Sequence, residues 1–187
     1  MTLQVAELIT PVGPLTVATD AGAVVASGFG SAREVVDRLA GRGRGPVDLG
    51  VAPAPPEAES VQVTESVPPS DLPGGIAAAV TAYFAGDVEA LDSIPARQSG
   101  TPLQESVWQA LRLIPAGQTW SYGQLAAAIG RPAAVRAVGQ ACGANRIAPF
   151  VPCHRAVRSD GALGGYAYGL EIKQWLLTHE GAALPIG

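Results

Sequence analysis

The stretch SYGQLAAAIGRPAAVRAVGQAC, residues 121–142, predicts two short helices that follow each other closely. Ser121 is a good residue to cap the first helix, which carries Leu125 on its apolar face. Gly130 suits the left-handed end of that helix, and Pro132 suits the first turn of the next one. Two short helices joined at Gly-Arg-Pro indicate a helix-turn-helix.

The second of these helices is rich in alanine and glycine, and Arg136 and Gln140 are its only long polar side chains. In a DNA-binding helix-turn-helix the second helix enters a groove. A small-residue surface would fit against a duplex backbone while Arg136 probes the base stack. A helical hairpin packed tightly on its neighbour explains the same pattern, so the motif leaves both interpretations open.

Two further helices are expected on either side of this pair. Residues 102–114 place Val107, Trp108 and Leu111 on one helical face, and Pro115-Ala-Gly117 should break that helix. Residues 170–179 form the last clear helix. Its expected buried face holds Ile172, Trp175 and Leu176.

The first hundred residues have a different pattern. Residues 14–29 predict a β-hairpin around Asp20-Ala-Gly22, and Ser31 with Glu34 forms a capping box for a helix that runs to about Ala40. Residues 41–75 are rich in glycine and proline and predict a long loop. The expected fold class is α+β. A small N-terminal hairpin and helix domain over residues 1–97 precedes a mainly helical C-terminal domain over residues 98–187 that contains the helix-turn-helix.

Composition limits the function classes. With 187 residues, 48% of them hydrophobic, the chain can bury a substantial core. No apolar run approaches the roughly 20 residues needed to cross a bilayer, and two cysteines suit a reducing compartment. We therefore expect a cytoplasmic protein with no membrane partner.

Net charge is −4, which argues mildly against a nucleic-acid partner. The distribution of charge argues the other way, because residues 112–173 contain seven basic and two acidic side chains. The C-terminal half is therefore locally positive.

The stretch Val151-Pro-Cys-His-Arg155 carries the most chemistry. A lone cysteine is usually a small buried hydrophobe, and an adjacent histidine does not prove pairing. A zinc site could be drawn from Cys142, Cys153, His154 and His179, but it lacks the paired short spacing of structural zinc sites. A papain-like hydrolase would need far more chain between its cysteine and its histidine.

Several motifs together point to one family. They are Tyr122 in Ser-Tyr-Gly-Gln-Leu-Ala, Arg136 in Arg-Ala-Val-Gly, Asn145, Pro-Cys-His-Arg, and His-Glu-Gly at residues 179–181. In these motifs and their spacing the chain closely resembles the O6-alkylguanine-DNA alkyltransferases. The resemblance is strong over about residues 98–182 and weaker over the preceding hairpin, helix and Tyr-Phe-Ala-Gly segment.

The resemblance implies direct-reversal DNA repair, in which Cys153 takes an alkyl group, mainly methyl, irreversibly from O6 of guanine. A thiol at its ordinary pKa of about 8.5 is mostly protonated at neutral pH, so the reaction needs an activated thiolate. His154 would take the proton through a water, and Glu180 would hold the imidazole in the useful tautomer. Asn145 would hold the recognition helix against the active-site turn, and Tyr122 would donate to the leaving base.

The resemblance also implies the substrate and its surroundings. The main chain at Ala156 would accept from the guanine amine, and Tyr166 would wall the pocket. The partner would be double-stranded DNA carrying O6-alkylguanine, bound through the minor groove with the damaged base flipped out. The residues expected against DNA are Ser121, Ala133, Arg136, Ala137, Gly139 and Gln140. No metal and no cofactor are expected. The protein should be a monomer, with cooperative binding along DNA left open.

The sequence departs from the family pattern near the pocket. Ala167 stands where many relatives have a hydroxyl-bearing residue, and Tyr168 stands where some have glycine. The bulk of Tyr168 predicts a preference for methyl over benzyl adducts. Two rival functions remain: a non-catalytic sensor of alkyl lesions with the same fold, and a transcriptional regulator that uses the helix-turn-helix alone.

Overall fold

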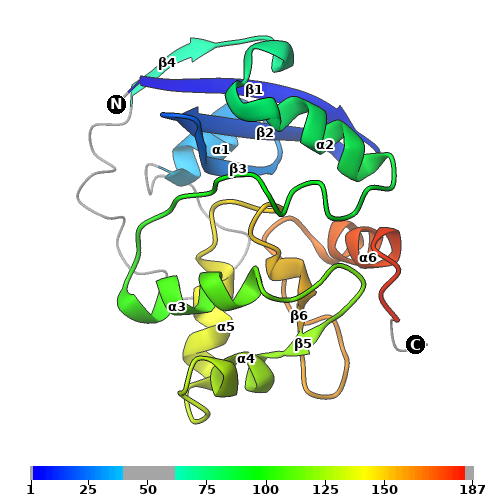
Figure 1. Ribbon diagram of the computed structural model, residues 1–187. Helices are drawn as coiled ribbons and strands as arrows, with labels where there is room; N and C mark the ends of the chain where they lie inside the picture. The colour runs from blue at the N-terminus through cyan, green and yellow to red at the C-terminus, as the bar shows by residue number, and fades with distance from the viewer. Residues whose placement is uncertain (1, 40–61, 184–187) are drawn as a thin grey trace. The chain divides into compact units, whose positions relative to one another are not determined.

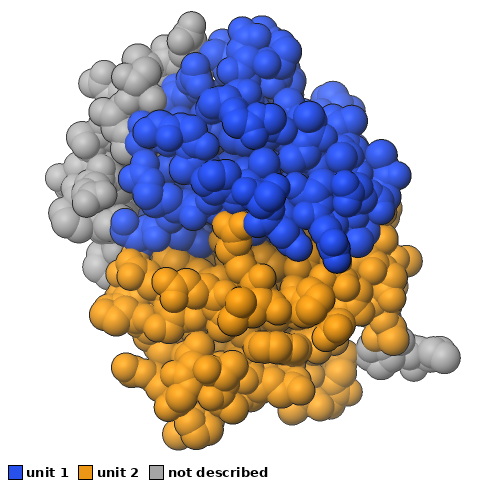
Figure 2. Space-filling view, viewed as in Figure 1, with its two compact units in different colours: residues 1–45, 52–99, 146–150 blue, residues 46–51, 100–145, 151–187 orange. Residues whose placement is uncertain are grey.

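The computed structural model describes residues 2–39 and 62–183 (Figure 1). It mixes helix and strand, as predicted, and divides into two compact units that are coloured separately in Figure 2. Among the described residues, the first unit contains 2–39, 62–99 and 146–150, and the second contains 100–145 and 151–183. The short segment 146–150 therefore packs with the N-terminal unit although it lies between two parts of the second.

The first unit is built on a four-stranded sheet with the order β3-β2-β1-β4. Its strands are β1 (Thr2–Thr10), β2 (Gly13–Asp20), β3 (Ala23–Phe29) and β4 (Gln62–Ser66). The first three pair antiparallel, and β4 pairs parallel with β1. In the β2–β3 turn, Ala21 and Gly22 both have positive φ, of 48° and 80°. This is the backbone that a two-residue hairpin loop requires, so the predicted hairpin is confirmed.

The sheet is larger than the sequence predicted. No strand was expected over residues 2–10, yet β1 is the central partner that joins β2 to β4. The prediction of a loop over 41–75 is wrong at its C-terminal end, where β4 is followed by two 3₁₀ turns, η2 (Pro69–Asp71) and η3 (Pro73–Gly75). A parallel edge strand draws its partner from far away in the chain, so local composition does not reveal it. Residues 41–61 of that prediction lie outside the described part of the chain.

Helix α1 (Ala32–Leu39) covers one face of this sheet. Its capping box is confirmed, because the Ser31 amide donates to Glu34 Oε2 over 2.8 Å and the Glu34 amide donates to Ser31 Oγ over 3.4 Å. Val35 and Val36 pack into a core with strand residues such as Val25. Helix α2 (Ile76–Phe84) completes the unit, with Ile76, Val80 and Tyr83 buried.

The second unit holds four helices among its described residues: α3 (Pro102–Leu111), α4 (Tyr122–Ala128), α5 (Val135–Gly143) and α6 (Leu170–His179). Between them lie the two-residue strands β5 (Trp120–Ser121) and β6 (Ala156–Val157), which pair parallel, and the 3₁₀ turn η4 (Cys153–Arg155). Trp108 on α3 is buried, and its Nε1 donates to the Ala141 carbonyl on α5 over 2.8 Å. That contact fixes α3 against α5.

The helix starts agree with the sequence in one case and differ in another. Ser121 caps α4 in a full capping box with Gln124, as predicted. Pro132 does not begin α5, because residues 132 and 133 form a turn and the helix starts at Val135. The predicted buried face of α6 is also partly wrong, since the buried residues are Lys173, Leu176 and Leu177. A buried lysine breaks the apolar pattern on which that prediction relied.

Among the residues that the structure describes, no helix is long and apolar enough to cross a membrane.

Candidate active site

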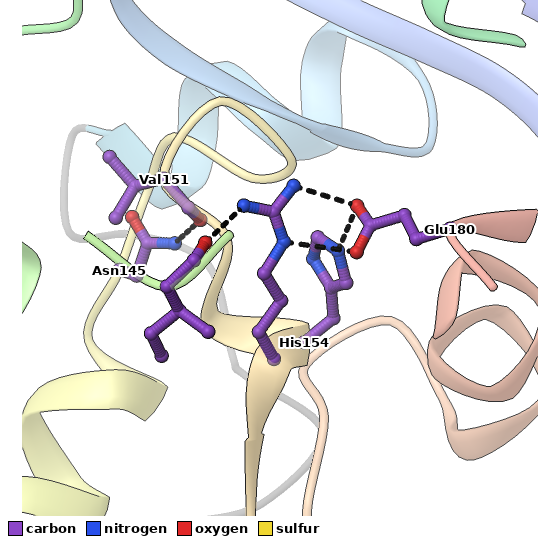
Figure 3. Close-up of polar contacts among 6 residues, drawn as sticks. Asn145, Val151, His154 and Glu180 are labelled. Atoms are coloured by element: carbon purple, nitrogen blue, oxygen red, sulfur yellow. Dashed lines mark hydrogen bonds and ion pairs between the residues drawn. The ribbon is translucent and has the colours of Figure 1, made fainter. Parts of the chain in front are cut away.

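The site is organised by the loop from Asn145 to Cys153. Asn145 is buried just after α5, and its Nδ2 donates to the Val151 carbonyl over 2.8 Å (Figure 3). The same Nδ2 donates to Cys153 Sγ over 3.2 Å. The Asn145 side chain therefore connects the end of α5 to Val151, which lies just before η4, and to the sulfur of Cys153. Cys153 is buried, with 9% of the residue exposed.

His154, the next residue of η4, is 1% exposed and faces the end of α6. Its Nε2 lies 2.9 Å from Oε1 of Glu180, which follows the last residue of that helix (Figure 3). The turn after α3 approaches the same point. Gly117 has a φ of +79°, and a methyl group on it would lie 2.9 Å from the Glu180 carbonyl oxygen. Glycine is therefore required for the turn to pass so close to α6.

Arg155 holds the other side of the Glu180 carboxylate. Its Nε donates to Oε2 and its Nη2 to Oε1, each over 2.9 Å, which is a bidentate pair. Its Nη1 donates to the Ile114 carbonyl over 2.6 Å, and the whole side chain is buried. The arginine of Pro-Cys-His-Arg had no role in the sequence interpretation, and its charge alone could not show that it would be buried against this carboxylate.

The electrostatics of the pair decide which atom of the imidazole can act. Burial by itself raises the pKa of Glu180, but His154 and Arg155 outweigh burial and lower that pKa to about 2. Burial lowers the pKa of His154, and the attraction of Glu180 only partly opposes this. The ring is therefore neutral and the carboxylate ionised at neutral pH.

An ionised carboxylate can only accept hydrogen bonds, so Nε2 of the neutral ring must carry the proton. Nδ1 is then the unprotonated nitrogen. It is buried and has no hydrogen-bond partner within the part of the chain that the structure covers. The His154 ring thus has one unprotonated nitrogen, Nδ1, that no described residue of this chain hydrogen-bonds.

Tyr122, the first residue of α4, lies beside the loop that follows β6. A methyl group on Gly164 would lie 3.0 Å from the Tyr122 hydroxyl oxygen. Burial raises the pKa of Tyr122 to about 12, and negative charge at Cys142 and Cys153 adds to this effect. The hydroxyl therefore keeps its proton at neutral pH and is available as a donor.

Aromatic rings stand around the same loop. The Tyr166 ring meets the His154 ring edge to face, with centroids 6.5 Å apart, and meets the Tyr168 ring with centroids 5.5 Å apart. Ala167, between the two tyrosines, is partly exposed. The rings of His154, Tyr166 and Tyr168 therefore form a continuous aromatic row that begins at His154.

Lys173 was not predicted as part of the site, yet it is fully buried beneath this loop. Its Nζ donates to the Ala156 carbonyl over 2.6 Å, to the Leu163 carbonyl, and to the Gly165 carbonyl over 3.4 Å. Burial lowers the pKa of Lys173 to about 8, which negative charge at Cys153 and Cys142 partly opposes. The ammonium therefore clamps the two ends of the pocket loop, and no sequence pattern distinguished it from an ordinary helix-surface lysine.

The second cysteine has a different environment. Cys142 lies on α5 and is buried, and burial together with the charge of Cys153 raises the pKa of its thiol far above the ordinary value. A thiol that stays protonated is a poor nucleophile.

The residues predicted to lie against DNA form a separate group. Arg136 and Gln140 lie one helical turn apart on α5 and are both exposed. Ala137 and Gly139 on the same helix are partly exposed, and nothing lies within 4 Å of where a methyl group on Gly139 would be. Ala133 is exposed in the turn before α5, and Ser121 caps α4. This side of α5 is therefore accessible, and most of its side chains are small.

The zinc alternative finds no support in the structure. Within residues 2–39 and 62–183, no three His, Cys, Asp or Glu side chains form a group that could hold a metal ion, so the four residues of the zinc alternative do not come together. A cavity of about 420 Å³ lies in the first unit, lined by side chains of β1 and α2 such as Leu8 and Phe84. It contains none of the predicted site residues.

The comparisons with known proteins point to one family. Residues 102–182 match the family described as 6-O-methylguanine DNA methyltransferase, DNA binding domain. The chain is 54% identical over 112 residues to the methylated-DNA–protein-cysteine methyltransferase of Salmonella typhimurium, an alignment that covers 60% of this chain and 66% of that relative. A protein of the same description from Methanosarcina acetivorans is 50% identical over 101 residues, covering 54% of this chain and 64% of the relative. The alignments thus span just under two thirds of these relatives.

Solved structures extend the likeness over nearly the whole chain. The structure of Mycobacterium tuberculosis OGT in complex with DNA has a TM-score of 0.72 and 31% identity, covering 95% of this chain and 92% of that one. The structure of the M. tuberculosis O6-methylguanine methyltransferase has a TM-score of 0.70 and 30% identity, covering 99% and 96%. The sequence motifs, the buried Cys-His-Glu arrangement and these matches lead to one conclusion: the chain belongs to the O6-alkylguanine-DNA alkyltransferase family, the methylated-DNA–protein-cysteine methyltransferases.

Proposed function

We propose that this protein repairs DNA by moving an alkyl group from O6 of guanine onto Cys153. The observation that carries the proposal is the state of His154. Its Nε2 is committed to an ionised Glu180, and its Nδ1 is a buried basic nitrogen with no partner among the described residues. This nitrogen belongs to the residue next to Cys153 in the sequence, and we propose that it removes the thiol proton.

The nucleophile would be Cys153 Sγ. The Asn145 amide already donates to this sulfur over 3.2 Å, and an amide N–H aimed at sulfur stabilises negative charge on it. His154 Nδ1 would receive the thiol proton through one bridging water. Glu180 would stabilise the resulting imidazolium, and Arg155 would hold Glu180 in place.

The transfer itself would be an in-line displacement at the alkyl carbon. The new S–C bond forms as the C–O6 bond breaks, and the electron pair of that bond passes into the guanine ring. Tyr122, protonated at neutral pH and close to the pocket loop, would donate a hydrogen bond to the leaving base. The products are a thioether and a guanine anion, and the anion takes up one proton to become guanine, which balances the proton that the thiol gave to His154. Water does not readily attack a thioether, so each molecule would act once.

The substrate would be double-stranded DNA, because α5 exposes a surface of small residues that fits against a duplex. The α4–α5 pair would act as the helix-turn-helix, with the small exposed surface of α5 against the minor groove. O6 lies inside the stack, so the damaged base must be flipped out at a cost of a few kcal/mol. Arg136, exposed on α5, would fill the gap that the base leaves. Ala156 would accept from the guanine amine and Tyr166 would wall the pocket.

The adducts would be mainly methyl. Tyr168 packs against Tyr166 in the aromatic row, which favours a narrow pocket, and Ala167 can offer O6 only a backbone N–H. The active form would be a monomer on the lesion.

Intact mass spectrometry after mixing with a duplex that contains O6-methylguanine tests the proposal. The wild-type protein should gain the mass of one methylene, once per molecule, and the oligonucleotide should recover guanine. Cys153→Ala should gain nothing. Cys142→Ala is the matched control, because it removes the other buried thiol, and it should gain the same mass as the wild type. Tight binding of the lesion without any change in mass would favour the sensor function instead.

A further inference from the structure

The segment that leads to Cys153 is attached to the edge of the N-terminal sheet. β3 is one of the two edge strands of the four-stranded sheet, and its residue Ser27 forms a parallel bridge with Ile147. The Ser27 amide donates to the Arg146 carbonyl over 2.8 Å, and the Ser27 hydroxyl donates to the Ala148 carbonyl. Residues 146–148 thus behave as a short extra strand beside β3.

A second side chain holds the same segment from the chain that follows α2. Gln98 Oε1 accepts from the Arg146 amide over 3.0 Å. Ser27, Ile147 and Ala148 are completely buried, so water does not compete for these hydrogen bonds. Three consecutive residues are therefore fixed by two side chains and one backbone bond.

This attachment lies inside the loop that Asn145 closes. Asn145 precedes the attached residues directly, and its amide reaches Val151 and Cys153 on the other side of them. All residues from Ile147 to Val157 are buried, so the loop has little freedom to absorb a displacement. A shift of residues 146–148 would be passed to the Asn145 amide and to the sulfur that it contacts.

We infer that Ser27 and Gln98 are positioning residues for Cys153: they hold residues 146–148 on the sheet edge so that the Asn145 amide and the sulfur keep their geometry. The part of this inference that concerns reaction rate rests on the proposed alkyl transfer. Misplacing a reacting atom by about 1 Å can cost about 100-fold in rate, and the loss of one of several attachments should cost less, about tenfold.

The test compares Ser27→Ala with Thr16→Val. Thr16 is also completely buried in the sheet, and its hydroxyl donates to the Gly30 carbonyl over 2.7 Å, away from residues 146–148 in the chain. Each variant removes one hydroxyl-to-carbonyl hydrogen bond made by a completely buried residue of the first unit, so both should lose similar stability. Only Ser27→Ala should slow the single-turnover transfer of methyl at saturating DNA, by about tenfold, while its Kd for the same duplex stays within about twofold. Gln98→Ala removes a different contact of the same segment and decides the question if Ser27→Ala does not fold.

Hydrogen exchange gives a readout that does not depend on repair activity. Peptides that cover residues 146–153 should exchange their amides at least about fivefold faster in Ser27→Ala than in the wild type, and at the wild-type rate in Thr16→Val. Unchanged exchange in that peptide, or a transfer rate that falls equally in Thr16→Val, would overturn the inference. If the wild type transfers no methyl, the proposed function fails, and the exchange comparison still decides the role of Ser27 and Gln98.

Discussion

Glu180→Gln is the most informative single substitution, because the carboxylate joins the candidate base to a buried arginine. His154 and Arg155 lower the pKa of Glu180 from the ordinary 4.5 to about 2 despite its burial. That fall corresponds to about 3 kcal/mol of folding free energy. The glutamine variant should lose about this much at neutral pH, because it leaves the Arg155 charge buried without a counter-charge.

The same difference should depend on pH in a defined direction. Since the pKa of the folded state lies below that of the unfolded state, the stabilisation is fully present above about pH 4.5 and is lost as the pH falls through about 2. Urea unfolding of the wild type and the variant, measured from neutral to acidic pH, should show two stabilities that converge in this range. Glu171→Gln makes the same change in an exposed residue of the same helix and should differ little from the wild type at any pH.

The variant should also slow methyl transfer at saturating DNA, by about 100-fold, because the neutral amide no longer fixes the proton on Nε2 of His154 or stabilises the imidazolium. A stability loss under about 1 kcal/mol, or a difference that stays constant between about pH 6 and about pH 3, would refute the assignment of an ionised, doubly paired carboxylate.

Three further substitutions test other parts of the site. Lys173→Met should lower stability in urea by about 2 to 3 kcal/mol, because the carbonyls of the pocket loop lose their shared donor; a variant as stable as the wild type would show that the clamp contributes nothing. Tyr122→Phe should reduce the single-turnover rate by about tenfold with an unchanged Kd for DNA, and an equal rate would mean that the Tyr122 hydroxyl does not stabilise the leaving base. Tyr168→Gly should raise the ratio of benzyl to methyl transfer by at least about tenfold, measured on two matched oligonucleotides, whereas an unchanged ratio would mean that this ring does not limit the pocket.

Much of the local structure could be predicted from neighbouring residues alone. The hairpin at Asp20-Ala-Gly22, the box of Ser31 with Glu34 and the cap at Ser121 all depend on side chains and backbone within a few positions. Such contacts form wherever the motif occurs, because the partners are already held close by the chain. The candidate roles of Cys153 and His154 were predicted only from the family resemblance that several motifs carry together, because Pro-Cys-His-Arg alone did not establish them.

Other features depend on partners that are distant in the chain. β4 pairs with β1 across about sixty residues. Arg155 hydrogen-bonds to Glu180, which follows it in the chain, and to the carbonyl of Ile114, which precedes it. Lys173 sits in a helix whose apolar pattern predicted another face, and only the carbonyls brought together by the pocket loop make its burial possible. A polar group can be buried when its partners converge on it, and that convergence is a property of the folded chain.

The sequence therefore predicted the candidate reactive residues and determined the short-range turns and caps, since both are recorded in local motifs. The tertiary structure decided which nitrogen of His154 is free to act, which charges hold Glu180, and that residues 146–148 belong to the edge of the N-terminal sheet. Each of these depends on the burial and direction of a side chain relative to groups far away in sequence, and local spacing carries no record of either.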